Sequence, residues 1–440
     1  GFTPPLTEDA TGNRQTGFWI FIDRNNNYNY AEAIGDNPDT SWTDCTSRVV
    51  LSPSGGWTNE TIIHHEATTL ILMSMDCIEP IFSKKSMSVA TTVIVFPEDD
   101  IFTYALPVFQ QNPHAGVDCA FMSNQNLFWY HYGSALFPVF LDERFGSGDG
   151  ALLPLFWEAA KQDGTVTSFY PLPSADVPND PDILEGIDAV LLDRQSSLNE
   201  AFVEFARWRY FVGTRDDGNH FANGHLWGGG EVAFDTTIEI DDLPLVDRTP
   251  QDNPQEYGTN YLSLDLAGLD PDLGVRFEFA GATGVEWNVD ALLLPADGPA
   301  EVETMVIDSE GAGQLDLIDL DGVEEIVYVV SNLGDGDHNA NNPDCSVGDE
   351  YTYALSAGDL AAAPEITGVD PEQLTIGEET YVWVSGADFG ENMSVEFSGE
   401  GVAVLAVDFV DSTSLGLQVA VDTAASPGSR DLTITNGYGR

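Results

Sequence analysis

The chain has 440 residues, which is enough for two or three domains with sizeable cores. It carries 73 acidic and only 15 basic residues, so its formal net charge is −58. This excess argues against nucleic acid as a partner, because the phosphates would be repelled. Two explanations of the acidity stay open, a high-salt or divalent-rich setting and a generally acidic secreted proteome. No run of apolar residues is long enough to predict a transmembrane segment.

The cysteines are few and widely spaced, at Cys45, Cys77, Cys119 and Cys345. None of them forms a C-x-x-C motif, so a zinc knuckle is not expected. One or two disulfides in an oxidising compartment are expected, with one pair among Cys45, Cys77 and Cys119. The sequence alone does not choose between the pairings.

The first 228 residues combine a turn-rich start with several helical patterns. Apolar runs predict strands at 17–22 and 48–51. The oxygen-rich segment 23–29 is either a polar turn or a calcium loop, although Tyr28 and Ile34 depart from the EF-hand pattern. Periodic apolar residues and capping signals predict helices over 61–75, 132–145, 151–162, 182–192 and 198–212. The apolar segment 81–95 contains a β-branched run with weak helix propensity. Ser196 and Ser197 are candidate caps of the last of these.

After residue 228 the pattern changes to alternation with a period of two. Such segments occur at 262–266, 275–279, 291–294 and 326–330, separated by turns rich in Gly, Asp and Asn. This pattern predicts a β-sandwich over 229–360. A short Ala-Pro linker then leads into another module of short strands over 361–440.

His65 and Glu66 open an incomplete zinc-protease motif. In H-E-x-x-H, two His residues one helical turn apart bind zinc while the Glu acts as general base. The residue four positions after His65 is Thr69, and a hydroxyl is a poor zinc ligand beside imidazole. His64 does not replace the missing ligand, because adjacent helix residues point about 100° apart.

Several segments together resemble a myxobacterial-type secreted metalloprotease family. The matching segments are 65–69, 76–80, 95–100, 112–116, 132–137 and 201–208, and the resemblance covers roughly residues 18–355. It implies a multidomain α+β fold with a mainly helical metalloprotease-like domain over 1–228, followed by the β-sandwich. It also implies a helix over 81–95 and places a downstream Glu ligand of the family within 84–86, with Lys85 favoured.

The departures from this family predict a degenerate site at His65, Glu66, Thr69 and Lys85. Two of three zinc ligands are replaced, and a catalytic zinc needs three protein ligands and a water. We therefore expect no zinc, no catalytic residues and no enzymatic activity. The alternative is an active zinc protease with unconventional ligands, in which His114 or His131 joins His65.

The C-terminal module resembles an IPT/TIG domain, an immunoglobulin-like sandwich, through 364–371, 384–390, 395–397 and 428–436. Family members usually continue with one more strand, so the domain is expected to be truncated here. An unpaired sheet edge is a template for strand addition. This predicts self-association, as a filament or large homo-oligomer, or binding to other extracellular proteins.

One loop of the sandwich carries alternating oxygen ligands, at Asp335, Asp337, Asn339, Asn341 and Asp344. Six to eight oxygens suit calcium, so this loop is either a calcium site or a solvated acidic loop. Together these features predict a secreted pseudo-metalloprotease that serves as a structural or binding component of an extracellular or cell-surface assembly. An adhesive or carbohydrate-binding surface protein is the further alternative.

Overall fold

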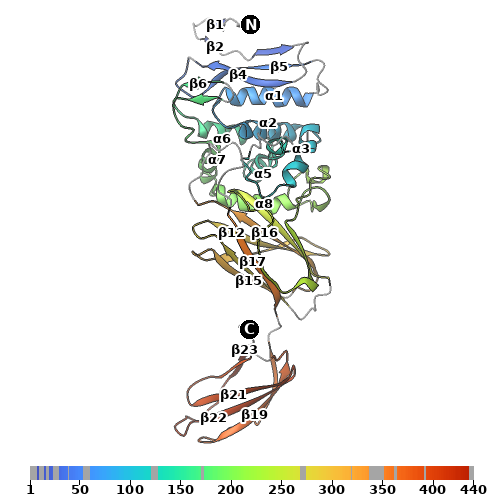
Figure 1. Cartoon of the computed structure of the whole chain (residues 1–440), viewed down its shortest axis with the longest axis vertical. Coiled ribbons are helices and arrows are strands. Elements are labelled where there is room, and N and C mark those ends of the chain that lie inside the picture. The colour runs from blue at the N-terminus through green and yellow to red at the C-terminus, as the bar shows by residue number, and fades with distance from the viewer. Residues whose placement is uncertain are drawn as a thin grey trace.

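The structure is a computed structural model of the chain. It describes residues 7–8, 14–15, 19–22, 29–37, 39–52, 60–119, 127–169, 173–267, 274–318, 320–335, 351–360, 364–390 and 393–435. Figure 1 shows an elongated molecule in which a small sheet, a layer of helices, a β-sandwich and a separate β-module follow one another along the long axis.

The first sheet covers one side of the helical layer. It has the order β3-β5-β4, formed by β3 (Trp19–Ile22), β5 (Cys45–Leu51) and β4 (Tyr30–Asp36). A disulfide between Cys45 and Cys77 ties β5 to the turn that follows the first helix. The expected pair among the first three cysteines is thereby confirmed.

The helices pack around a core rich in aromatic side chains. They are α1 (Glu60–Met73), α2 (Ile81–Val95), α3 (Asp100–Gln110), α4 (Tyr130–Gly133), α5 (Leu136–Phe145), α6 (Leu153–Ala160), α7 (Ile183–Leu192) and α8 (Leu198–Tyr210). Capping boxes begin two of them, with Asp182 and Glu185 at α7 and with Ser197 and Glu200 at α8. A short hairpin of β6 (Val166–Ser168) and β7 (Ser174–Ala175) lies beside this layer.

The sandwich consists of two five-stranded sheets. The first has the order β13-β12-β16-β10-β8, from β13 (Glu301–Thr304), β12 (Trp287–Pro295), β16 (Val323–Asn332), β10 (Gly258–Asp265) and β8 (Thr236–Glu239). The second has the order β14-β15-β11-β17-β9, from β14 (Val306–Ile307), β15 (Ala312–Leu317), β11 (Gly274–Gly281), β17 (Tyr353–Leu360) and β9 (Leu245–Arg248).

Helix α8 covers the outer face of the first sheet of the sandwich. Ala206 and Tyr210 of α8 pack there against Val327 and Val329 of β16. The alternate residues Ile326, Tyr328 and Val330 fill the core between the two sheets. Because both faces are covered, β16 is apolar at consecutive positions instead of alternating.

The last module has a four-stranded sheet and a two-stranded one. The larger has the order β18-β19-β22-β21, from β18 (Glu365–Asp370), β19 (Glu379–Ala387), β22 (Ser414–Val421) and β21 (Val402–Asp411). The smaller pairs β20 (Ser394–Phe397) with β23 (Leu432–Thr435). Their facing side chains, including Val382, Val384, Leu417 and Ile434, form a separate core.

The expectation of a mainly helical first domain in an α+β protein was wrong. Among the described residues strand exceeds helix, with 34% in strands and 26% in helices. The error lies mainly in the turn-rich start, where β5 pairs with β3 on one side and with β4 on the other. In β5 the buried positions Cys45, Ser47 and Val49 alternate with half-buried ones, and the polar members of this strand weakened its signal in the sequence.

Candidate functional site

Helices α1 and α2 pack against each other and bring His65, Glu66 and Lys85 together. His65 and Glu66 lie on the buried side of α1, with exposed fractions of 2% and 5%. Lys85 and Ser88 lie one turn apart on α2 and therefore project from the same side of that helix. The structure thus assembles three of the four residues of the expected degenerate site around one point.

The two ring nitrogens of His65 have different partners. Nε2 lies 3.2 Å from Lys85 Nζ, and Nδ1 lies 2.9 Å from Ser88 Oγ. An ammonium can only donate, so Nε2 is the acceptor and the ring proton sits on Nδ1, facing Ser88. The Ser88 hydroxyl in turn donates to the carbonyl of Lys85 at 3.1 Å. Burial, reinforced by the Lys85 charge, holds the pKa of His65 well below 6.5, so the ring is neutral.

Glu66 supplies the charge that balances Lys85. Its Oε2 lies 3.5 Å from Lys85 Nζ, and its Oε1 lies 3.9 Å from His65 Nε2. Burial opposes the charge of Lys85, but the Glu66 carboxylate, with help from Tyr132, outweighs burial and raises the pKa of Lys85. Lys85 is therefore a buried, charged ammonium held between a carboxylate and an imidazole.

Two residues of α4 close the cluster. The Tyr132 ring lies 5.7 Å from the His65 ring, and the Lys85 ammonium lies 5.8 Å from the Tyr132 ring centre. His131 is 1% exposed, and neither of its ring nitrogens has a hydrogen-bond partner among the described residues. Burial and then the Lys85 charge lower the pKa of His131 to about 3, so this second imidazole is also neutral.

Thr69 does not point its hydroxyl at this cluster. Its Oγ1 donates to the carbonyl of His65 at 3.1 Å, one turn back along α1, a common contact of Thr within helices. The donor set around His65 does not fit a catalytic zinc, because its Nε2 lone pair already accepts from an ammonium and the second His position is a hydroxyl turned to the backbone. In the described part of the chain, no group of three or more His, Cys, Asp or Glu side chains is arranged to hold a metal.

A second buried charge cluster lies beside the disulfide, and the sequence did not reveal it. Lys84 Nζ donates to the carbonyl of Cys77 at 2.8 Å, while burial lowers the pKa of Lys84 to about 8. Neither carboxylate oxygen of Glu79 has a hydrogen-bond partner among the described residues, and burial raises its pKa well above 4.5. Burial also raises the pKa of Asp76 to about 6. Adjacent helix positions point about 100° apart, so Lys84 and Lys85 serve different clusters.

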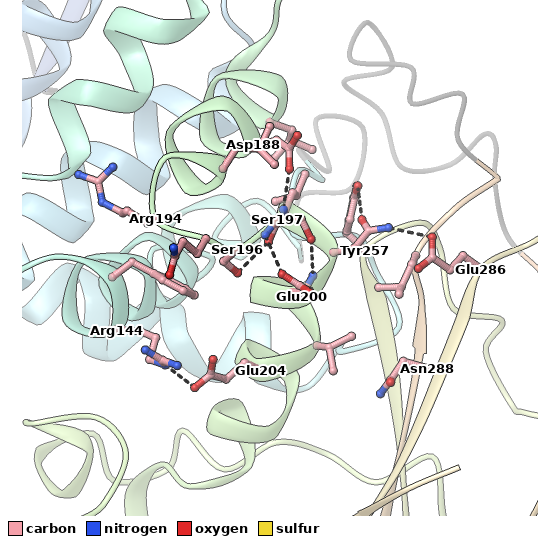
Figure 2. Close-up of a pocket in the computed structure, with 18 of the residues that line it drawn as sticks. Arg144, Asp188, Arg194, Ser196, Ser197, Glu200, Glu204, Tyr257, Glu286 and Asn288 are labelled. Carbon is pink, nitrogen blue, oxygen red and sulfur yellow. Dashed lines mark hydrogen bonds and ion pairs between the residues drawn. The ribbon is translucent and has the colours of Figure 1, made fainter. Parts of the chain in front are cut away.

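A hollow of about 1170 Å³ lies where the helices meet the sandwich (Figure 2). Its walls come mainly from the end of α5, the connection from α7 to α8, the start of α8 and the beginning of β12. Asn199 joins the two sides, because it accepts from the Tyr257 hydroxyl at 3.1 Å and donates to Glu286 at 3.0 Å. Arg144 is paired with Glu204 at 2.5 Å. The contacts of Asn199 cross from α8 to the sandwich and the Arg144 pair joins α5 to α8, so these polar groups of the hollow bind one another and favour a structural role.

The remaining expected sites fall largely outside the described residues. Asp337, Asn339, Asn341 and Asp344 of the calcium loop are not described, and neither are residues 23–28 of the earlier loop. Asp335 is described, and its Oδ2 accepts from the Tyr351 hydroxyl at 3.0 Å. His114 is placed at the junction with the sandwich, where its carbonyl accepts from the backbone N–H of Gln255 at 2.8 Å.

The comparisons with known proteins identify one part of the chain. The family model of the IPT/TIG domain matches residues 364–438, so the C-terminal module is an immunoglobulin-like IPT/TIG domain. No metalloprotease family model matches. No curated protein matches the chain. No described helix combines the length and the apolar character needed to cross a membrane.

Proposed function

We propose that this protein is a secreted structural or binding component of an extracellular or cell-surface assembly, and that its His65 cluster is a metalloprotease-like site that has lost zinc chemistry. One observation carries this proposal: Lys85 Nζ lies 3.2 Å from His65 Nε2. This places a cation at the ring nitrogen with which a metal would have to bond.

The chemistry of zinc hydrolysis explains why this contact matters. A catalytic zinc takes up imidazole lone pairs, keeps one position for water, and relies on a free carboxylate as general base. Here the His65 lone pair accepts from Lys85, and Glu66 is engaged by the same ammonium. The side chains of the motif stabilise one another, so the cluster serves the packing of α1 on α2.

The cysteines favour an extracellular location. Cys45 and Cys77 are bonded to each other, and Cys119 is also in a disulfide. Disulfides persist in oxidising compartments and are rare in reducing ones. All cysteines in the described part of the chain are therefore in the state expected for a secreted protein.

The IPT/TIG domain offers a surface for self-association. In the described residues β23 pairs with β20 alone, so its other edge has no strand beside it. Next to β20 and β23 lies a groove of about 550 Å³, whose lining includes Leu374, Ile376 and Phe397. A strand edge beside apolar side chains suits an added strand from a second copy. This domain lies at the opposite end of the molecule from β3-β5-β4 (Figure 1), and head-to-tail contacts between opposite ends build open filaments.

Metal analysis of the purified protein tests the loss of zinc chemistry. After exposure to zinc and removal of the excess, we expect far less than one zinc per chain and no cleavage of casein, because the ligand set is incomplete. About one zinc per chain, with chelator-sensitive cleavage that Glu66→Ala abolishes, would overturn the proposal.

Self-association is tested separately, by light scattering on the full chain at increasing protein concentration and at moderate salt. We expect particles heavier than the 47.6 kDa monomer, with a mass that grows with concentration. A single monomeric species at every concentration would contradict assembly, and it would leave the result of the zinc test unaffected.

A further inference from the structure

The outer face of the four-stranded sheet in the IPT/TIG domain carries two exposed aromatic rings. Trp383 is 47% exposed and Tyr381 is 43% exposed, and both project from β19 on the side away from the domain core. Their ring centres are 5.4 Å apart with an interplanar angle of 68°. Tyr and Trp are enriched at binding interfaces, because each combines a large apolar ring with a polar group.

The strand register places polar residues in the same row as Trp383. Across the sheet, Asp370 of β18 lies opposite Trp383, Trp383 lies opposite Gly416 of β22, and Gly416 lies opposite Asp408 of β21. Directly opposite residues of antiparallel strands share a face. The indole is therefore flanked by a carboxylate on one side and by a glycine followed by a second carboxylate on the other.

The neighbouring row is similar. Tyr381 lies opposite Gln418, and Gln418 lies opposite Ala406. On the other side of Trp383, Ser385 lies opposite Ser414. Around the two rings this face thus offers hydroxyl, amide and carboxylate groups, which both donate and accept hydrogen bonds.

Two contacts hold the aromatic pair in a fixed arrangement. The Tyr381 hydroxyl donates to Asp408 Oδ2 at 2.9 Å, which ties β19 to β21 across β22. The Tyr381 phenol lies so close over Gly416 that any side chain at residue 416 would collide with the phenol oxygen. The absence of a side chain at Gly416 therefore gives the phenol the space it occupies.

We propose that this face, centred on Trp383 and Tyr381, is a binding site for a glycan that carries no acidic groups. The C–H groups on the face of a sugar ring are weakly positive and pack against the negative face of an aromatic ring. Asp370, Asp408 and Gln418 are placed to accept hydrogen bonds from sugar hydroxyls beside the rings. The carboxylates, in a chain of net charge −58, repel anionic polysaccharides.

A protein partner fits this face less well than a glycan. The centre of a protein interface is depleted in charged residues and rich in apolar contact. Here two carboxylates lie in the row of Trp383, and the small Ala406 lies in the row of Tyr381. The larger exposed side chains of Leu405 and Val410 lie at bulges of β21, outside these paired rows. Glycan binding at this face does not depend on how the His65 cluster functions.

Binding of the full chain to defined polysaccharides tests the proposal. The probes are microcrystalline cellulose, chitin, starch and β-1,3-glucan, with alginate as the anionic comparison and poly-lysine as the basic one. We expect retention on at least one of the four non-acidic glycans and none on alginate. Trp383→Ala should weaken this binding by about tenfold or more, because stacking is lost. Tyr381→Phe, which keeps the ring and loses the bond to Asp408, should weaken it less.

Trp42→Ala is the matched control, because Trp42 is 40% exposed but lies in the N-terminal part of the chain. It should bind like the wild type. Trp383 lies on the surface, so unchanged melting of Trp383→Ala will show that its domain is folded. Failure of the wild type to bind any of the four glycans would overturn the proposal. So would equal binding by Trp383→Ala, or a dependence on Trp383 seen with poly-lysine alone.

Discussion

The Lys85 ammonium lies 3.5 Å from Glu66 Oε2, where the two side chains are only 12% and 7% exposed. This pair joins α2 to α1 and places a positive charge next to the neutral His65 ring. Removing one partner of a buried ion pair leaves the other charge without compensation, which costs more than the pair itself contributes. The stability of the helical layer should therefore depend on both partners together.

A double-mutant cycle measures this coupling. Lys85→Met should lower the free energy of unfolding by about 3 kcal/mol, and Glu66→Gln by a comparable amount. The double variant should lose less than the sum of the two, with an interaction term of about 2 kcal/mol in urea melts. Lys161→Met is the control, because its pair with Glu158, which is 63% exposed, should contribute less than about 1 kcal/mol. Additive losses would show that Lys85 and Glu66 act independently.

The second charge cluster predicts a pH dependence of stability. Burial raises the pKa of Asp76 to about 6 from its ordinary 3.8. Between these values the folded chain keeps a proton that the unfolded chain releases. The stabilisation is therefore complete below pH 3.8 and is lost as the pH rises through 6.

Asp76→Asn isolates this effect, because an amide oxygen can still accept from Ile78 and Thr43 as the carboxylate does. The stability of the wild type relative to this variant should fall by at most about 3 kcal/mol between pH 4 and pH 7. Thermal melts of both proteins across that range provide the measurement. A constant difference would mean that Asp76 does not hold the proton.

The sequence predicted individual helices of this protein better than the overall proportion of helix and strand. A helix was expected at 182–192 from periodic apolar residues and capping signals, which are local, and α7 (Ile183–Leu192) lies there. The helix at 81–95 was expected from the family resemblance, since its β-branched run alone has weak helix propensity, and α2 (Ile81–Val95) lies there. Strand β4 was missed, since its residues are mostly half-buried and it is held by pairing with β5. That pairing is a contact between segments, which no local pattern reveals.

The candidate site shows the same limit. The motif at His65 was readable in the sequence and the family resemblance pointed to Lys85, whereas the contacts of Ser88 and His131 with that cluster depend on the packing of α1, α2 and α4. The cluster of Lys84 and Glu79 was hidden because a Lys beside another Lys reads as a solvated pair. Only the geometry shows that Lys84 turns inward to the carbonyl of Cys77.

The disulfide gives a third prediction. Cys45 and Cys77 are separated by 32 residues in sequence. Closing a loop of that length lowers the entropy of the unfolded chain, which stabilises the fold by about 4 kcal/mol. The variant with Cys45→Ser and Cys77→Ser should unfold at correspondingly lower urea concentration. Reductant should lower the stability of the wild type. If reductant destabilises this variant just as much, the effect in the wild type must come from another disulfide.

The net charge of −58 gives the last prediction. Uncompensated carboxylates repel one another in the compact state, and salt screens them over a distance that falls from about 10 Å at 0.1 M to about 3 Å at 1 M. The melting temperature should therefore rise with NaCl, most steeply at low concentration. Calcium chloride at matched ionic strength separates screening from binding, because an added rise at millimolar calcium requires specific sites such as the loop that includes Asp335. Equal effects of the two salts would assign the stabilisation to screening, and a melting temperature unchanged in both would show that charge repulsion does not limit the stability of this fold.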